Sequence, residues 1–263
     1  MMAGGNVPAL LDRGHEVEWI IHTKKGEKEV LEKIIEGYIR SNLSFSVEEY
    51  DGTEEQMFGA LIRKVINRKM ILASPDMYFG NGAIDNLVKC SEGNNFCIAV
   101  PHIRVNDKEF IDRIGDEAVS NPELVAVGMG CLHRSWSQAF IDAPTNNCTD
   151  SGSFVRSVAE NLWVSTFRIP TLFLVNIEES DLKALESYYY YDHRWPEKLI
   201  AEKRFKYIGS SDVFFAVELT SPNNNVPQLK GNSHWNDTYK STLGHCETNR
   251  NFLVTMRGQH KRV

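Results

Sequence analysis

The chain has 263 residues, of which 42% are hydrophobic and 24% are charged. These proportions are typical of a globular protein and exclude a chain that is disordered throughout. The formal net charge of −6 argues against a broad basic surface for nucleic acid. No apolar run reaches the ~18–20 residues of a membrane span, and the first residues lack the basic and apolar regions of a signal peptide. The five cysteines form no CxxC pair, which favours free thiols. We therefore expect a cytoplasmic protein without a membrane span.

Over roughly the first hundred residues, the sequence predicts alternating strands and helices. Residues 16–23 and 44–50 are rich in β-branched and aromatic side chains, which favours strands. Between them, apolar residues at helical spacing predict a helix over residues 26–40. A second helix is predicted to begin after Thr53, because a threonine followed by two glutamates is a suitable helix start.

Two short apolar runs follow, at residues 69–73 and 96–100, and both predict buried strands. A helix is predicted between them, over residues 83–90. Strands that alternate with helices in this way indicate βαβ units. The sequence therefore predicts an α/β fold of Rossmann-like type, with a three-layer, mainly parallel sheet.

The second half is less regular. Asn121 begins a predicted helix, and residues 135–151 predict a long polar loop. Residues 171–175 and 213–217 predict further strands. No segment has the composition of a linker, so we expect a single domain over residues 1–263.

The start of the chain has an unusual composition. Residues 4–8 read Gly-Gly-Asn-Val-Pro, as in a glycine-rich loop that follows a first strand, yet no strand precedes them. The alternative interpretation is a frayed terminus.

The segment after residue 73 contains the most informative pattern. A predicted buried strand ends in Ser74-Pro75-Asp76, and Gly80-Asn81-Gly82 follows as a strong turn signal. Ligands of open parallel sheets bind at the carboxyl ends of strands. A carboxylate there is suited to Mg²⁺ or Mn²⁺, which prefer oxygen ligands and bridge to diphosphate. The alternative is that Asp76 only organises the turn by accepting a backbone N–H.

This order of elements resembles the central part of GT-A-type glycosyltransferases, in which a buried strand ends in a D-x-D motif. The chain keeps the second acid as Asp76 and has Ser74 in place of the first. It is also similar to a little-characterised bacterial and viral group of glycosyltransferase-like proteins. That likeness is based on residues 5–8, on Pro75-Asp76 with Asn81-Gly82, and on Asp192-His193 followed by residues 211–215.

The resemblance implies transfer of a sugar from a nucleoside-diphosphate sugar to an acceptor hydroxyl, with a divalent cation (Mn²⁺ or Mg²⁺) as cofactor. It implies a nucleotide-binding half over residues 1–105 and an acceptor-side half over residues 106–263. The acceptor stays open among a glycan, a lipid-linked sugar, a protein and a modified base in viral DNA. The residues implied to bind the cofactor and donor are Gly5, Asn6, Ser74, Asp76, Asn81 and Gly82, with Asp76 as the cation ligand.

A second candidate cluster, residues 188–196, combines aromatic, acidic and basic side chains. Aromatic rings stack on sugars or bases, and Asp192 with His193 is suited to act as a base or a metal ligand. Arg194 is suited to neutralise a diphosphate. The alternative is an aromatic core segment with one satisfied aspartate.

Three further residues are weaker candidates. Glu178 is an alternative catalytic base, because an enzyme that inverts the sugar configuration needs a carboxylate to deprotonate the acceptor. The resemblance implies a further metal ligand from a late histidine such as His234. His102 follows a predicted strand, so it is expected near the cleft of Asp76 unless it is a satisfied core histidine.

A non-catalytic protein that binds nucleotides or glycans on the same scaffold is the alternative function. Ser74 in the D-x-D position and the missing first strand favour it.

Overall fold

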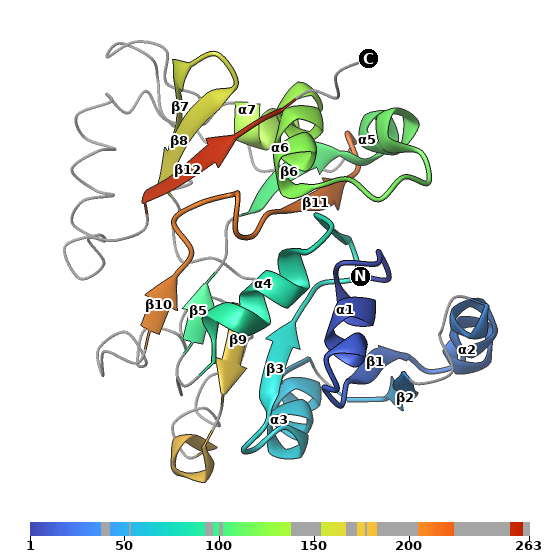
Figure 1. Cartoon of the computed structure of the whole chain (residues 1–263). Helices are drawn as coiled ribbons and strands as arrows, with labels where there is room; N and C mark the ends of the chain where they lie inside the picture. Colours follow the sequence, from blue (N-terminus) through green and yellow to red (C-terminus); the bar gives the residue numbers. More distant parts are fainter. Residues whose placement is uncertain are drawn as a thin grey trace.

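The computed structural model shows mixed helices and strands, which confirms the α/β class (Figure 1). It describes residues 1–37, 43–52, 54–92, 97–99, 102–137, 154–166, 173–176, 178–182, 205–223 and 253–259. The helices are α1 (Val7–Asp12), α2 (Lys28–Glu36), α3 (Glu54–Lys64), α4 (Ala83–Cys90), α5 (Asp107–Ile114), α6 (Asn121–Gly130), α7 (Arg134–Ser137) and the 3-10 helix η1 (Glu179–Asp181). The strands are β1 (Glu18–Lys24), β2 (Ser44–Tyr50), β3 (Lys69–Leu72), β4 (Met77–Phe79), β5 (Cys97–Ala99), β6 (His102–Asn106), β7 (Phe154–Ala159), β8 (Leu162–Thr166), β9 (Phe173–Asn176), β10 (Phe205–Tyr207), β11 (Ala216–Thr220) and β12 (Leu253–Arg257).

The described strands form four small sheets, in the orders β1-β2, β10-β5-β9-β3, β4-β11-β6 and β12-β8-β7. Pairing is parallel in β1–β2, β10–β5 and β11–β6, and antiparallel in the other five pairs. The described residues therefore do not confirm one mainly parallel, three-layer sheet. The second sheet shows this most clearly, because β9 runs antiparallel to both of its neighbours, β3 and β5.

Several predicted elements are confirmed with close boundaries. The second strand spans residues 44–50 and the helix after the glycine-rich turn spans residues 83–90, as predicted. The strand predicted at residues 213–217 is wrong in position, because β11 begins only at Ala216. A turn precedes it, in which the Val213 N–H donates to the Ser210 carbonyl at 3.2 Å.

The part of the sheet formed by β6 and β11 has one apolar face and one face that carries polar side chains. Side chains alternate along a strand. Ile103, Val105 and Val217 are fully buried in a cluster with Phe110 of α5 and Leu124 of α6. These two helices therefore cover one face of the sheet β4-β11-β6 (Figure 1). The residues that alternate with this apolar set point to the other face.

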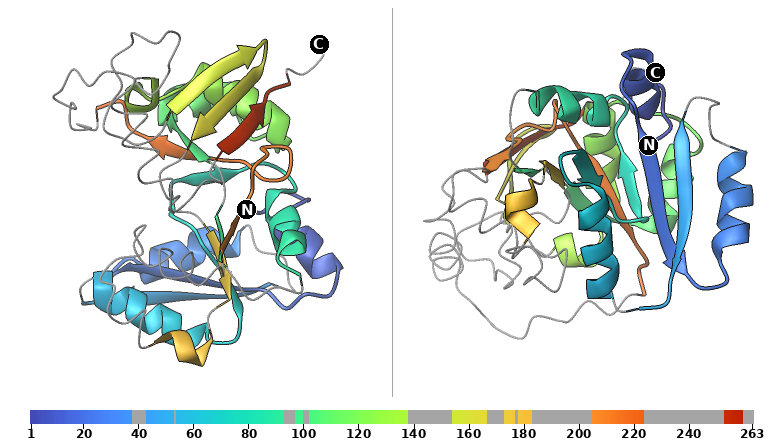
Figure 2. Two further views of the ribbon diagram at one scale, coloured as in Figure 1. Left: turned by 90° about the vertical axis from the view of Figure 1, so that its left-hand side faces the viewer. Right: turned by 90° about the horizontal axis from the view of Figure 1, so that it is seen from below.

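A second apolar cluster joins the start of the chain to this sheet. Leu10 of α1 and Leu87 of α4 pack in it with Phe79 of β4, Phe214 and Ala216. Helices α1 and α4 contact each other and lie side by side in two views (Figures 1 and 2). The first residues are thus part of the core, and the interpretation as a frayed terminus is wrong.

Two further findings concern membrane spans and cysteines. In the described ranges no helix is long and apolar enough to cross a bilayer. Cys90 and Cys131 are free thiols.

Candidate functional site

Asp76 lies on the turn between β3 and β4, half-buried, after the carboxyl end of β3. The turn is closed by the Met77 N–H, which donates to the Ser74 carbonyl at 3.2 Å, so the carboxylate of Asp76 is not needed to close it. The Asp76 carbonyl instead accepts from the Leu219 N–H of β11 at 2.8 Å. The backbone of Asp76 is therefore fixed to the sheet β4-β11-β6.

Ser74, in the place of the first acid of the D-x-D motif, has a contact with the second. Its exposed hydroxyl donates a hydrogen bond to Oδ1 of Asp76. A neutral hydroxyl orients the carboxylate without adding a second negative charge. Ser74 thus positions Asp76 and leaves Oδ2 for other partners.

The polar face of the same sheet carries His102 and Arg104 of β6 and Glu218 of β11. The parallel register places Arg104 directly beside Glu218. Arg104 holds the carboxylate through a hydrogen bond of 3.0 Å from Nε to Oε2 and an ion-pair contact of 3.0 Å between Nη2 and Oε1. Such a two-point pair fixes both position and orientation. His102 Nε2 lies 3.7 Å from Oε2 of Glu218.

Burial controls the ionisation of this face. Burial first, and the charge of Arg104 second, lower the pKa of His102 to about 4, against the opposing charge of Asp76. Burial also raises the pKa of Glu218, while Arg104 opposes that change and the charge of Asp76 adds to it. Asp76 is therefore close enough to affect both groups. The face therefore combines two carboxyl groups, Asp76 and Glu218, with the Arg104 guanidinium and a His102 whose low pKa leaves it neutral near neutral pH.

This charge and donor set fit a hard divalent cation. Carboxylate oxygens are its preferred protein ligands, and Mg²⁺ is commonly held by one or two carboxylates together with substrate phosphates and water. In the described part of the chain, no group of three or more histidine, cysteine or acidic side chains could hold a metal by itself. A cation at Asp76 would therefore need ligands from the substrate as well.

Four predicted donor-binding residues are brought together at the start of α4. The Gly5 N–H donates to Oδ1 of Asn81 at 2.7 Å. A Cβ on Gly5 would lie 2.7 Å from that oxygen and 2.9 Å from the Gly82 nitrogen, so only glycine fits. Asn6 is fully buried; its amide donates to the Gly80 carbonyl at 3.1 Å, and its Oδ1 accepts from the Ile84 N–H at 3.0 Å.

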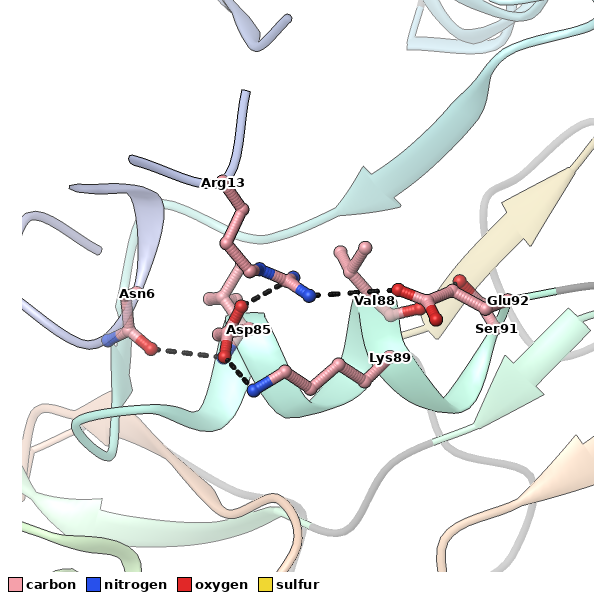
Figure 3. A network of polar contacts seen from close by, with 8 residues as sticks. Asn6, Arg13, Asp85, Val88, Lys89, Ser91 and Glu92 are labelled. Carbon is pink, nitrogen blue, oxygen red and sulfur yellow. Dashed lines mark hydrogen bonds and ion pairs between the residues drawn. The ribbon is translucent and has the colours of Figure 1, made fainter. Parts of the chain in front are cut away.

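These contacts make the cluster a structural joint that fixes the turn before α4. Figure 3 shows Asp85 beside it, between Arg13 and Lys89. Arg13 Nη2 lies 2.5 Å from Oδ1 of Asp85, and Lys89 Nζ lies 2.7 Å from Oδ2. The pair with Arg13 connects the segment after α1 to α4. Asn6 thus holds the turn after β4, whereas Asp76 lies on the turn before that strand.

The structure does not bring Glu178 to Asp76. β3 and β9 run antiparallel, with Lys69 paired to Asn176 and Leu72 to Phe173. Glu178 therefore lies beyond the start of β3, whereas Asp76 follows its end. In two views η1, the next element, lies at the opposite end of the molecule from β6 and β11 (Figures 1 and 2). Asp192, His193, Arg194 and His234 lie outside the described residues.

A cavity of about 160 Å³ occurs elsewhere, between α5, α6 and Gln259. Its lining includes Arg113 and Glu123 over an apolar floor, but neither Asp76 nor Glu218. It lies on the helix-covered side of the sheet, so it is not the candidate site.

Sequence reasoning missed Arg104 and Glu218 as site residues. A usable signal was present in the residues 102–106 and 216–220, where charged side chains alternate with apolar ones. Such alternation predicts a half-polar strand. Comparisons with protein-family models, curated proteins and solved structures gave no match.

Proposed function

We propose that the chain transfers a sugar from a nucleoside-diphosphate sugar to an acceptor hydroxyl, with a divalent cation bound at Asp76. The observation that carries the proposal is the place of this carboxylate. It is half-buried, oriented by Ser74, and lies beside a polar sheet face on which Arg104 holds Glu218.

Each group has a role that its chemistry supports. Asp76 supplies the anionic oxygen for the cation, which when bound would neutralise the leaving diphosphate. Arg104, with 41% of its side chain exposed, presents donors toward solvent that can contact phosphate oxygens. Burial keeps His102 neutral, so it adds no positive charge that would compete with the cation.

The finer architecture belongs to this proposal. The order of β3, the turn that carries Asp76, β4, a glycine turn and α4 resembles the local arrangement of a GT-A-type enzyme. We propose a Rossmann-like, nucleotide-binding arrangement of which β1, β2 and β3 form part. The acceptor class stays with the alternatives given by the sequence.

The test is donor turnover by the variant Asp76→Asn, which keeps the shape of the side chain and removes its charge. We expect Mn²⁺-dependent transfer or hydrolysis of the donor to fall at least about a hundredfold. Asp112→Asn is the matched control, because Asp112 is an exposed acid on α5. Circular dichroism should show that both variants fold.

Full activity in Asp76→Asn would remove Asp76 from the mechanism. Ser74, which supplies no charge, favours one other function, namely a protein that binds nucleotides or glycans without catalysis. Binding of a nucleotide sugar to the wild type, without turnover for any acceptor tried, would support that function instead.

A further inference from the structure

We propose that two copies of the chain associate through α2, in a symmetric antiparallel contact centred on Val30 and Ile34. The inference goes beyond the proposed function and does not depend on it, because α2 carries none of the residues assigned to the cation or the donor. Such an interface is isologous, which means that the same surface of each copy meets itself across a twofold axis.

The fold leaves part of the apolar side of α2 uncovered. The helix contacts β2, and Ile35 is its buried residue. Val30 and Ile34 are 59% and 53% exposed. Residues four apart in a helix are neighbours on its surface, so these two side chains form one continuous patch. Four large apolar side chains are exposed among the described residues, and only these two share an element.

The patch is within reach of another molecule. In two views α2 is the outermost described element on its side of the molecule (Figures 1 and 2). A second helix laid against it would remove the exposed parts of Val30 and Ile34 from water. Burial of apolar surface is the main favourable contribution to protein association. The patch therefore supplies the attraction, and the charges beside it decide which partner fits.

Glu29 and Lys33 lie along one flank of the patch. Each directly precedes one of the two apolar residues, so each is rotated by about 100° from it, in the same direction around the helix. Both side chains are exposed, and neither forms an ion pair within the described part of the chain. The flank thus carries a negative charge toward the start of the helix and a positive charge toward its end.

This order of charges is complementary to an inverted copy of itself. A twofold axis perpendicular to α2 turns the partner's helix end over end and brings the same flanks together. Val30 then meets the partner's Ile34, and Glu29 meets the partner's Lys33. The symmetry repeats both contacts, so two apolar and two opposite-charge contacts form at once. Charge complementarity therefore favours a second copy of the chain as the occupant of the patch.

The contact is small. α2 has nine residues and is about 14 Å long. Two such helices bury less than the roughly 1,200 Å² at which stable, specific interfaces begin. We therefore expect a weak, reversible dimer that forms at high micromolar protein concentrations and dissociates on dilution.

Sedimentation equilibrium over a concentration series measures this association for wild type and Ile34→Glu. Ile34 is exposed in the single chain and glutamate is a good helix former, so the variant should fold, which circular dichroism checks. We expect Ile34→Glu to weaken dimerisation at least about tenfold, because it places a charge in the centre of the contact. Ile111→Glu on α5 is the matched control, since Ile111 is also 53% exposed, and it should dimerise as wild type does.

Charge reversal tests the pairing itself. Glu29→Lys gives the flank two positive charges and Lys33→Glu gives it two negative charges. Each variant alone should dimerise about tenfold more weakly than wild type, because two attractive contacts become repulsive. An equimolar mixture of the two variants should regain the association of wild type, since each positive flank then meets a negative one.

Lys28→Glu and Glu32→Lys are the matched controls for charge reversal. Lys28 and Glu32 have the same spacing, lie 3.7 Å apart, and are on the side of α2 away from the patch. These variants, alone and mixed, should dimerise as wild type does.

A wild type that stays monomeric throughout the concentration series would overturn the inference. A dimer whose strength Ile34→Glu leaves unchanged would also contradict it, as would a mixture of Glu29→Lys and Lys33→Glu that associates no better than either variant alone. None of these results bears on donor turnover, which Asp76→Asn tests separately.

Discussion

His102 is the residue whose ionisation the fold changes most clearly among the described groups. Its pKa is about 4 in the folded chain, against an ordinary value of 6.5. Between these values the unfolded chain binds the proton and the folded chain does not. The free energy of unfolding therefore falls as the pH drops through 6.5 and stops falling near 4. The contribution of His102 is about 3 kcal/mol over that window.

The measurement is urea unfolding at about pH 7 and about pH 5 for wild type and His102→Gln. Wild type should lose about 2 kcal/mol more than the variant on acidification. Glu218 has the opposite sign, since its raised pKa favours the folded state in acid, and it is present in both proteins. His15→Gln, at an exposed position, is the control that should behave as wild type. Equal losses in all three proteins would contradict the account.

The sequence predicted part of the site at this scale. Asp76 was predicted because a carboxylate after a short apolar run has a recognisable pattern. His102 was predicted near it because it follows the next apolar run. Arg104 and Glu218 were not, because their contact depends on a register between β6 and β11, which lie 114 residues apart at this pair. No local pattern specifies such a pairing.

At the scale of the element, Asn6 is expected to be the main anchor of α4. Replacing it with alanine would leave the buried Ile84 N–H without its acceptor and would remove one of the two donors to the Gly80 carbonyl, which also accepts from the Ala83 N–H. We expect Asn6→Ala to lower the free energy of unfolding by about 2–3 kcal/mol. Chemical denaturation measures this directly.

Asn106 provides the matched comparison. It also caps a helix, because its side chain accepts from the Glu109 N–H at 3.2 Å, but that contact is exposed. Asn106→Ala should lower the free energy of unfolding by no more than about 1 kcal/mol. Equal losses of unfolding free energy in the two variants would mean that the buried hydrogen bonds of Asn6 stabilise the protein no more than an exposed helix cap does.

The sequence predicted an element where a clear local pattern marks it. α4 was found because a glycine turn precedes it, and Gly82 indeed adopts a positive φ of 89° there. β4 has only three residues, too few to show a strand pattern, and the alternating pattern of β6, which follows closely after β5, was overlooked. The buried Phe214 and Phe215 made a turn look like a strand. Composition alone does not distinguish a loop that tertiary packing buries from a buried strand.

At the scale of the whole molecule, strands from distant parts of the sequence share sheets. β9 and β10 pair with β3 and β5, and β11 lies between β4 and β6. The expected boundary at residue 105 therefore does not separate one sheet from another. The order and direction of strands are set by these long-range contacts, whereas the sequence gives only the succession of elements. Strand–helix alternation thus predicted the α/β class and not the small mixed sheets.

The central claim is that a divalent cation and a nucleoside diphosphate bind together at Asp76. Thermal unfolding of wild type and Asp76→Asn with a panel of nucleotide sugars, each with and without Mn²⁺, tests it most directly. A ligand that binds only the folded state raises the melting temperature. We predict that at least one nucleotide sugar stabilises wild type by several degrees only with Mn²⁺, and that Asp76→Asn loses this shift. Equal shifts in the two proteins, or no shift with any nucleotide sugar, would contradict the account.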